Sequence, residues 1–289
     1  MNKFEMPGRT PHNSEQIHPE IERAYDRARK TLQENAISLS DFEGLYDPKN
    51  LERDRERVKE REAYFQKSLT HNEVSKHYSD VLEAIFFDQI SNGSWFGENT
   101  QAIKTSSFDD YYNGADIILE LEDTARTLAH LSLSIDVTFG TTKTKEKMAG
   151  IKERIDKGTL GRINYFKSSR SGDRGEKSNL PQVVIGVEKD MIIELADLWM
   201  NSTGDAGAAN PISGHPVKRL ILSEILLQLH TFRTYAKEIG HVTLVPIYEK
   251  DIMILEDILR EQGMVDISKY RNDRVFMAIK DSLSIFKQK

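Results

Sequence analysis

The chain has 289 residues, of which 38% are hydrophobic and 30% charged, so it can bury the core of one large domain and is unlike a disordered chain. It contains no cysteine, which excludes disulfides and cysteine nucleophiles and makes the cytoplasm the expected location. No signal-like stretch opens the chain, and no apolar run approaches the roughly 20 residues that span a bilayer, so no membrane association is expected. A net charge of −6 argues against a nonspecific nucleic-acid coat protein, although a nuclease with clustered carboxylates remains compatible with it.

The first seventy residues are predicted to form a polar tail followed by two helices, over residues 19–35 and 50–68. In the second helix, Leu51, Val58 and Phe65 recur every seven residues among charged side chains. This narrow apolar stripe, which we call the seam, favours a mostly solvent-exposed helix that packs on the protein along one edge. The alternative is a coiled-coil contact with a second copy of the chain. The sequence therefore predicts an N-terminal extension over residues 1–70, through whose helices a homo-oligomer could form.

The middle of the chain alternates helix and strand. Amphipathic spacing predicts helices, and alternation of apolar with polar residues predicts strands. Residues 182–187 form a continuous apolar run, as expected of a buried central strand, whereas residues 167–179 read as a basic, flexible loop. The expected helices cover residues 72–90 and 142–157, and the expected strands cover residues 115–121, 131–139, 162–166 and 182–187.

The rest of the chain is mostly helical. The expected helices cover residues 191–200, 217–239, 251–261 and 274–286, with one late strand over residues 242–247. The fold class is therefore α/β, with a mixed β-sheet flanked by helices. We expect an α/β core over residues 71–250 and a C-terminal helical segment over residues 251–289.

Two aspartates define the candidate site. Asp116 follows Gly114 at the start of one predicted strand, and Asp136 is the one charge on the polar side of the next. At the same end of adjacent strands, the two carboxylates can converge on a hard cation such as Mg²⁺. The alternatives are backbone capping for Asp116 and a buried salt bridge for Asp136. Glu120, four residues beyond Asp116 on the same strand face, is a further candidate.

This arrangement resembles the PD-(D/E)XK nuclease superfamily over residues 72–187. Members of that superfamily have an acid-bearing helix, a hairpin with an Asp on one strand and D/E-X-K on the next, then a helix and further strands. The resemblance implies a restriction-endonuclease-like core that hydrolyses phosphodiester bonds with Mg²⁺ or Mn²⁺. Asp116 and Asp136 would hold the metal, with Glu83 on the preceding helix, or Glu120, as an additional ligand.

The sequence departs from the motif at Thr138, where the superfamily has a lysine that positions water and stabilises charge on the phosphate. Lys143, at the start of the next helix, is the expected substitute. If no lysine reaches the site, the chain would be a catalytically inactive nucleic-acid-binding or assembly module. The expected partner is nucleic acid, with DNA favoured. The weaker candidates for phosphate contact, for which a solvated surface is the alternative, are Lys145, Lys147, Lys167, Arg170 and Arg174.

Overall fold

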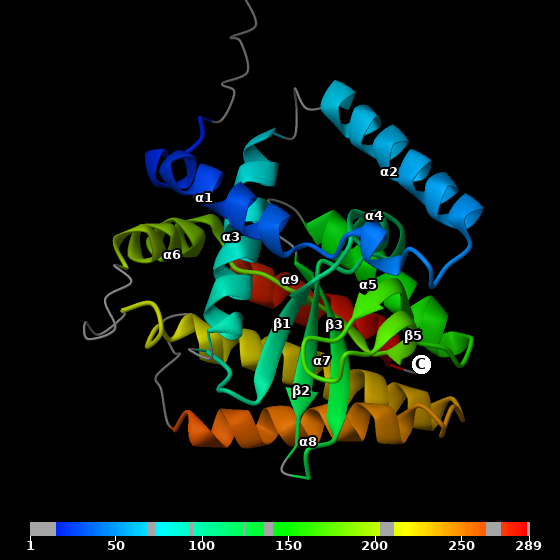
Figure 1. Cartoon of the computed structure of the whole chain (residues 1–289). Coiled ribbons are helices and arrows are strands. Elements are labelled where there is room, and N and C mark those ends of the chain that lie inside the picture. Colours follow the sequence, from blue (N-terminus) through cyan, green and yellow to red (C-terminus); the bar gives the residue numbers. More distant parts are fainter. Residues whose placement is uncertain are drawn as a thin grey trace, which may run out of the picture.

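The computed structural model describes residues 16–68, 73–92, 95–123, 125–135, 141–202, 211–263 and 273–287. In this part of the chain a four-stranded mixed sheet lies among helices, as Figure 1 shows. The strand order is β1-β2-β3-β6; β1 and β3 run antiparallel to β2, and β6 runs parallel to β3. The predicted α/β class with a mixed sheet is thus confirmed. The strands are β1 (Thr100–Lys104), β2 (Ile117–Glu122), β3 (Leu128–Ile135) and β6 (Gln182–Ile185).

Helices cover the sheet in two groups. In the first, α1 (Pro19–Asn35), α3 (Glu73–Ser91) and α6 (Lys189–Asn201) pack on one another, and α3 rests on β1. In the second, α7 (Val217–Glu238) packs on β6 and on α8 (Val245–Glu261), which contacts β2 and β3. The remaining elements of the second group are α5 (Thr141–Asp156), α9 (Arg274–Ser282) and the short 3-10 helix η3 (Leu283–Phe286).

A smaller hairpin forms from β4 (Gly161–Lys167) and β5 (Arg174–Leu180). It supports η1 (Leu39–Phe42), α2 (Pro48–Ser68) and α4 (Ser107–Asn113) through a separate hydrophobic cluster. Figure 1 shows α2 lying apart from the large sheet, over α4. The buried members of this cluster are Phe42, Leu51, Phe108 and Tyr165.

Side chains close the edge of the sheet at β6. Gln228 on α7 accepts a hydrogen bond from the Val184 N–H (2.8 Å) and donates to the Val184 carbonyl (2.7 Å). Nearby, Glu224 accepts a hydrogen bond from the Gly186 N–H at 3.2 Å. An open strand edge carries unpaired polar groups, and here α7 pairs them so that β6 can be fully buried.

Four sequence-based expectations are corrected. Residues 182–187 do not form a central strand, because β6 is the last strand in the sheet order. Within residues 167–179, the expected loop is partly strand β5. Residues 242–247 do not form a strand, because α8 begins at Val245 with a proline in its first turn, where a missing N–H costs nothing. Since α8 continues to Glu261, the expected division between residues 250 and 251 falls inside one helix.

Strand β1 and helix α4 were not expected from the sequence. None of the helices in the described ranges is both long and apolar enough to cross a membrane.

We predict that Gln228→Ala destabilises the fold by about 2–4 kcal/mol, because it leaves the buried N–H and C=O of Val184 unpaired. Urea unfolding followed by tryptophan fluorescence measures the loss. Thr234→Ala on the exposed side of the same helix is the matched control, and should change stability by less than about 0.5 kcal/mol. Equal effects of the two variants would contradict the proposed closure of the β6 edge.

Glu224 gives a pH-dependent prediction. Burial raises the pKa of Glu224 well above the ordinary value of 4.5. The hydrogen bond from the Gly186 N–H lowers this pKa in part, and the charge of Asp273 raises it further. Above pH 4.5 the folded chain therefore keeps a proton that the unfolded chain has lost, and wild-type stability falls as the pH rises. Glu224→Gln removes this titration, so the variant should gain stability relative to wild type between pH 5 and about 8. A stability difference that is constant across this range would contradict the assignment.

Candidate functional site

The candidate site centres on Lys104, the last residue of β1, which is only 7% exposed. Its ammonium lies 2.8 Å from the Glu83 carboxylate on α3 and 3.3 Å from Asp110 on α4. It also donates a hydrogen bond to the Asp116 backbone carbonyl at 3.1 Å. One ammonium therefore joins two helices and the start of β2.

The chain between β1 and β2 brings Asp110 and Asp116 to this point. Ser106 caps α4 by accepting a hydrogen bond from the Asp109 N–H at 3.1 Å. Gly114 ends α4 in the left-handed conformation, at a φ of 64°, where a glycine has no steric penalty. The helix is only seven residues long, so the chain returns at once to pair Ile117 with Lys104.

Three carboxyl groups, those of Glu83, Asp110 and Asp116, act on the single ammonium of Lys104. Burial raises the pKa of Glu83 to about 8; Lys104 opposes this shift, and Asp116 and Asp110 add to it. Burial alone would lower the pKa of Lys104, but Glu83, Asp110 and Asp116 together raise it above its ordinary value. Three carboxyl groups thus share one ammonium, and the cluster gains from additional positive charge.

The predicted site residues are partly brought together. Asp116 is half-buried, close enough to Glu83 to raise its pKa. The β2–β3 register pairs Ile117 with Leu133, so the end of β3 lies beside the start of β2. Asp136 and Thr138 lie outside the described residues. Lys143 belongs to the first turn of α5, and its side chain is likewise outside the description.

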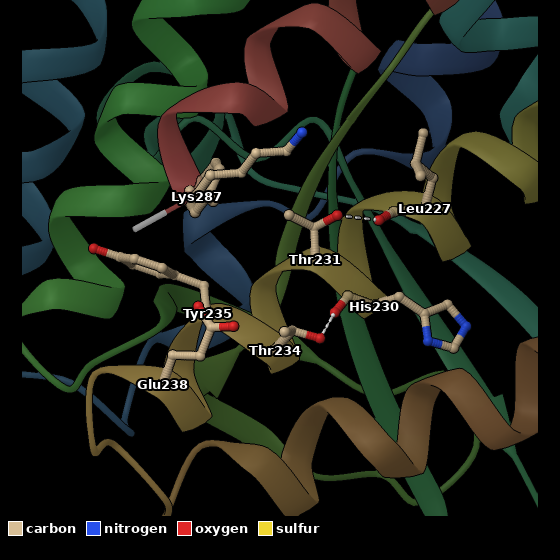
Figure 2. Close-up of a pocket in the computed structure, with 8 residues that line it drawn as sticks. Leu227, His230, Thr231, Thr234, Tyr235, Glu238 and Lys287 are labelled. Atoms are coloured by element: carbon tan, nitrogen blue, oxygen red, sulfur yellow. Dashed lines mark hydrogen bonds between the residues drawn. The ribbon is translucent and has the colours of Figure 1, made fainter. Parts of the chain in front are cut away.

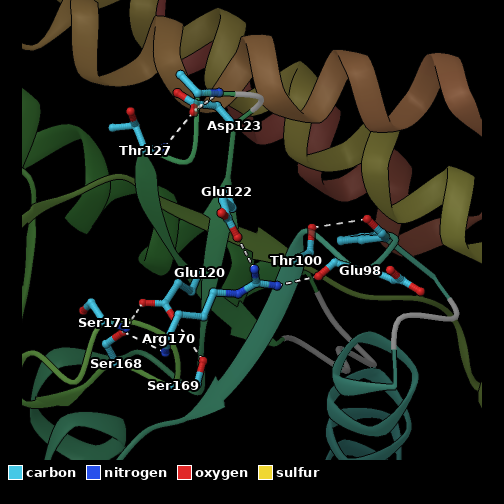
Figure 3. A network of polar contacts seen from close by, with 12 residues as sticks. Glu98, Thr100, Glu120, Glu122, Asp123, Thr127, Ser168, Ser169, Arg170 and Ser171 are labelled. Carbon is cyan, nitrogen blue, oxygen red and sulfur yellow. Dashed lines mark hydrogen bonds and ion pairs between the residues drawn. The ribbon is translucent and has the colours of Figure 1, made fainter.

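Glu120 belongs to a different network, which Figure 3 shows. Its fully buried carboxylate accepts hydrogen bonds from Ser168 (2.6 Å) and Ser169 (2.8 Å), and one oxygen lies 3.1 Å from a ring nitrogen of His130. Burial alone would raise the pKa of Glu120, but hydrogen bonds from these three side chains lower it to about 2. Each carboxylate oxygen therefore has a protein partner, and nothing in this geometry supports Glu120 as a metal ligand.

The basic residues predicted to contact phosphate are mostly held by acidic or carbonyl groups of the chain itself. Arg170 forms an ion pair with Glu122, also visible in Figure 3, and Lys167 pairs with Asp41 at 3.1 Å. Arg174 donates a hydrogen bond to the Asp41 carbonyl at 3.2 Å. These contacts fasten the β4–β5 hairpin and compete with phosphate for the same cations.

The two lysines predicted on α5 differ in their surroundings. Lys145 is exposed and Lys147 half-buried. Among the residues that the structure describes, no group of three or more His, Asp or Glu side chains is arranged as a set of metal ligands.

A pocket of about 670 Å³ opens along α7 beside the C-terminal residues (Figure 2). Its two threonine hydroxyls donate back to their own helix, Thr231 to the Leu227 carbonyl and Thr234 to the His230 carbonyl, each at 2.8 Å. Each hydroxyl proton is therefore already used within α7.

Lys104 and Asp110 were not among the residues predicted from the sequence. One signal was present in the sequence: Ser106 and Asp109 have the spacing of a helix N-terminal cap, and the five residues of β1 lie just before them. That pattern could have located α4 and hence β1. It could not have shown that Lys104 is buried.

Comparisons with models of known protein families, with curated proteins and with solved structures find no match to this chain.

We predict that Lys104→Met destabilises the fold by about 3–5 kcal/mol at neutral pH, because it leaves the Glu83 carboxyl buried without its cation. Wild-type Glu83 has a pKa of about 8, and without Lys104 that pKa should rise further, so the penalty should stay nearly constant from pH 5 to pH 7 and grow as the pH rises through 8, where only the wild-type carboxyl ionises. Urea unfolding at pH 6 and pH 9 measures it. The double variant Lys104→Met/Glu83→Gln should recover most of the loss, and strictly additive effects would contradict the pairing.

Proposed function

We propose that this chain is a metal-dependent nuclease whose site lies where Glu83, Lys104, Asp110 and Asp116 gather. The observation that carries the proposal is the surplus of carboxyl groups around one buried ammonium. A surplus of negative charge at a strand end suits a hard divalent cation, which binds carboxylate oxygens. Substrate phosphates add more negative charge and would need the same cation.

The order of elements supports a restriction-endonuclease-like core. Helix α3 supplies the acid Glu83, and the β2–β3 hairpin starts one residue after Asp116 and ends one residue before Asp136 in the sequence. Helix α5 and strand β6 follow, with β6 parallel to β3. This is the succession on which the resemblance to the PD-(D/E)XK superfamily rests.

The roles follow from the surroundings of each group. Asp116 and Asp136 would hold Mg²⁺ or Mn²⁺, which supplies Lewis acidity toward the phosphate and lowers the pKa of a bound water. Glu83, with a pKa of about 8, can hold or release a proton near neutral pH. Lys104 stays charged among its three protein partners, so its charge can offset that of a phosphate only at a distance, with Asp110 and Asp116 between them, as a partial substitute for the lysine that Thr138 replaces.

A second candidate is a catalytically inactive module of the same fold that binds nucleic acid or assembles a complex. The contact between Lys104 and Glu83 favours it, because an ammonium among carboxylates can take the place of a metal ion. The enzyme and the module share a fold, so only chemistry separates them.

We predict cleavage of nucleic acid by the purified chain with Mg²⁺ or Mn²⁺, and loss of cleavage with EDTA. The assay should include single-stranded, duplex and branched DNA and RNA. Asp116→Asn and Asp136→Ala should each lower the rate about a hundredfold or more, and Asp116→Asn should also weaken Mn²⁺ binding measured by calorimetry. Asp26→Ala, an exposed carboxylate on α1, is the control and should change neither.

The two candidate lysines are compared in the same assay. Lys104→Gln should lower the rate more than Lys143→Gln, and Lys104→Arg should retain more of it. Melting curves separate loss of chemistry from loss of folding. A folded protein that cleaves none of these substrates would contradict the enzyme and favour the binding module.

A further inference from the structure

A surface of aromatic and cationic side chains lies between α2 and α4. Three side chains in it are unusually open, with exposed fractions of 61% for Tyr64, 39% for Phe65 and 38% for Tyr112. Among the described residues these are the exposed large aromatic side chains, so such exposure is concentrated in one place. We call this surface the α2–α4 platform. It comprises Arg57, Arg61, Tyr64, Phe65, Tyr111 and Tyr112.

Rings and guanidinium groups alternate across the platform. The Arg61 guanidinium lies 4.8 Å from the Phe65 ring centre and 5.6 Å from that of Tyr64. Arg57 lies 4.1 Å from the Tyr112 ring centre. Both kinds of group present a flat face on which a nucleobase can stack, and the arginines add positive charge.

The charge of α2 differs from that of the chain. Residues 48–68 contain seven Lys and Arg and five Asp and Glu, a net charge of +2, whereas the whole chain carries −6. A locally basic helix on an acidic protein draws a polyanion to that helix.

Helix α4 joins the platform to the candidate site. Asp110, which contacts Lys104 at 3.3 Å, precedes Tyr111, whose ring centre lies 5.5 Å from that of Phe65. The platform and the candidate site therefore both include residues of one short helix, α4.

We propose that the α2–α4 platform binds the unpaired bases of single-stranded nucleic acid, DNA or RNA, and presents the adjoining phosphodiester to the Asp116 site. Bases in a duplex are already stacked on one another and expose only their edges, whereas unpaired bases offer their faces without sequence preference. This inference rests on the proposed nuclease function and specifies its substrate class.

The test measures binding in EDTA, so that it does not depend on cleavage. The probes are a fluorescein-labelled oligothymidylate, its oligouridylate counterpart and a blunt DNA duplex, followed by fluorescence anisotropy. The wild-type chain should bind the single strands more tightly than the duplex. Tyr64→Ala/Phe65→Ala should weaken single-strand binding about tenfold or more.

Three further variants serve as controls. Tyr64→Ala alone leaves the packing of Phe65 on Tyr111 intact and should still weaken binding. Tyr64→Trp keeps a stacking face and should retain binding. Met253→Ala removes a side chain of similar exposure, 52%, on α8 and should have no effect.

Each outcome bears on a different claim. Unchanged affinity in the Tyr64 and Phe65 variants, or tighter binding to the duplex, overturns the platform even if the chain cleaves nucleic acid. Absence of both binding and cleavage overturns the proposed function as well. A dimer in sedimentation that Tyr64→Ala/Phe65→Ala dissociates would assign the surface to a second copy of the chain and overturn the nucleic-acid assignment.

Discussion

Lys104 and Glu83 form an ion pair that is buried between the first strand of the sheet and the helix that covers it. Taking two charges out of water costs several kcal/mol, which is offset only when each charge is well surrounded. Here Asp110 and the Asp116 carbonyl complete the surroundings of the ammonium. The pair therefore fixes α3, β1, α4 and the start of β2 relative to one another. The geometry of the candidate site depends on it.

Two buried glutamates of the same core show what distinguishes this position. Glu120 receives hydrogen bonds from neutral donors and a histidine, so its pKa falls to about 2 and its charge is satisfied. Glu83 faces one ammonium and two further carboxyl groups, and its pKa rises to about 8. When two carboxyl groups lie in environments that give them very different pKa values, one stays ionised at neutral pH and the other can carry a proton, so their chemical roles differ. Of these two glutamates, Glu83 is the one whose surroundings gain from another cation, and this difference supports the site that we propose.

The sequence predicted the elements whose patterns are long, such as the helix over residues 19–35, which has the same bounds in the structure. It also indicated Glu83 and Asp116 as neighbours. It did not predict β1, because five residues ending in a lysine resemble a polar connection, and burial of that lysine depends on α3 and α4. The sequence of strand β5 predicts a loop, because most of its side chains are exposed and charged or small. Such elements are set by tertiary partners that local periodicity does not contain.

The heptad positions of helix α2 are buried in its first half and exposed in its second half. Leu51 is buried and Val58 is partly buried against the small hydrophobic cluster that Leu51 belongs to, but Phe65, at the same heptad spacing, is 39% exposed. A seam used only for packing would be buried along its whole length, and a seam used only for dimerisation would be exposed along it. The first half of α2 therefore anchors the helix. The second half lies beside α4 with Tyr64 and Phe65 exposed, which supports the α2–α4 platform that we propose.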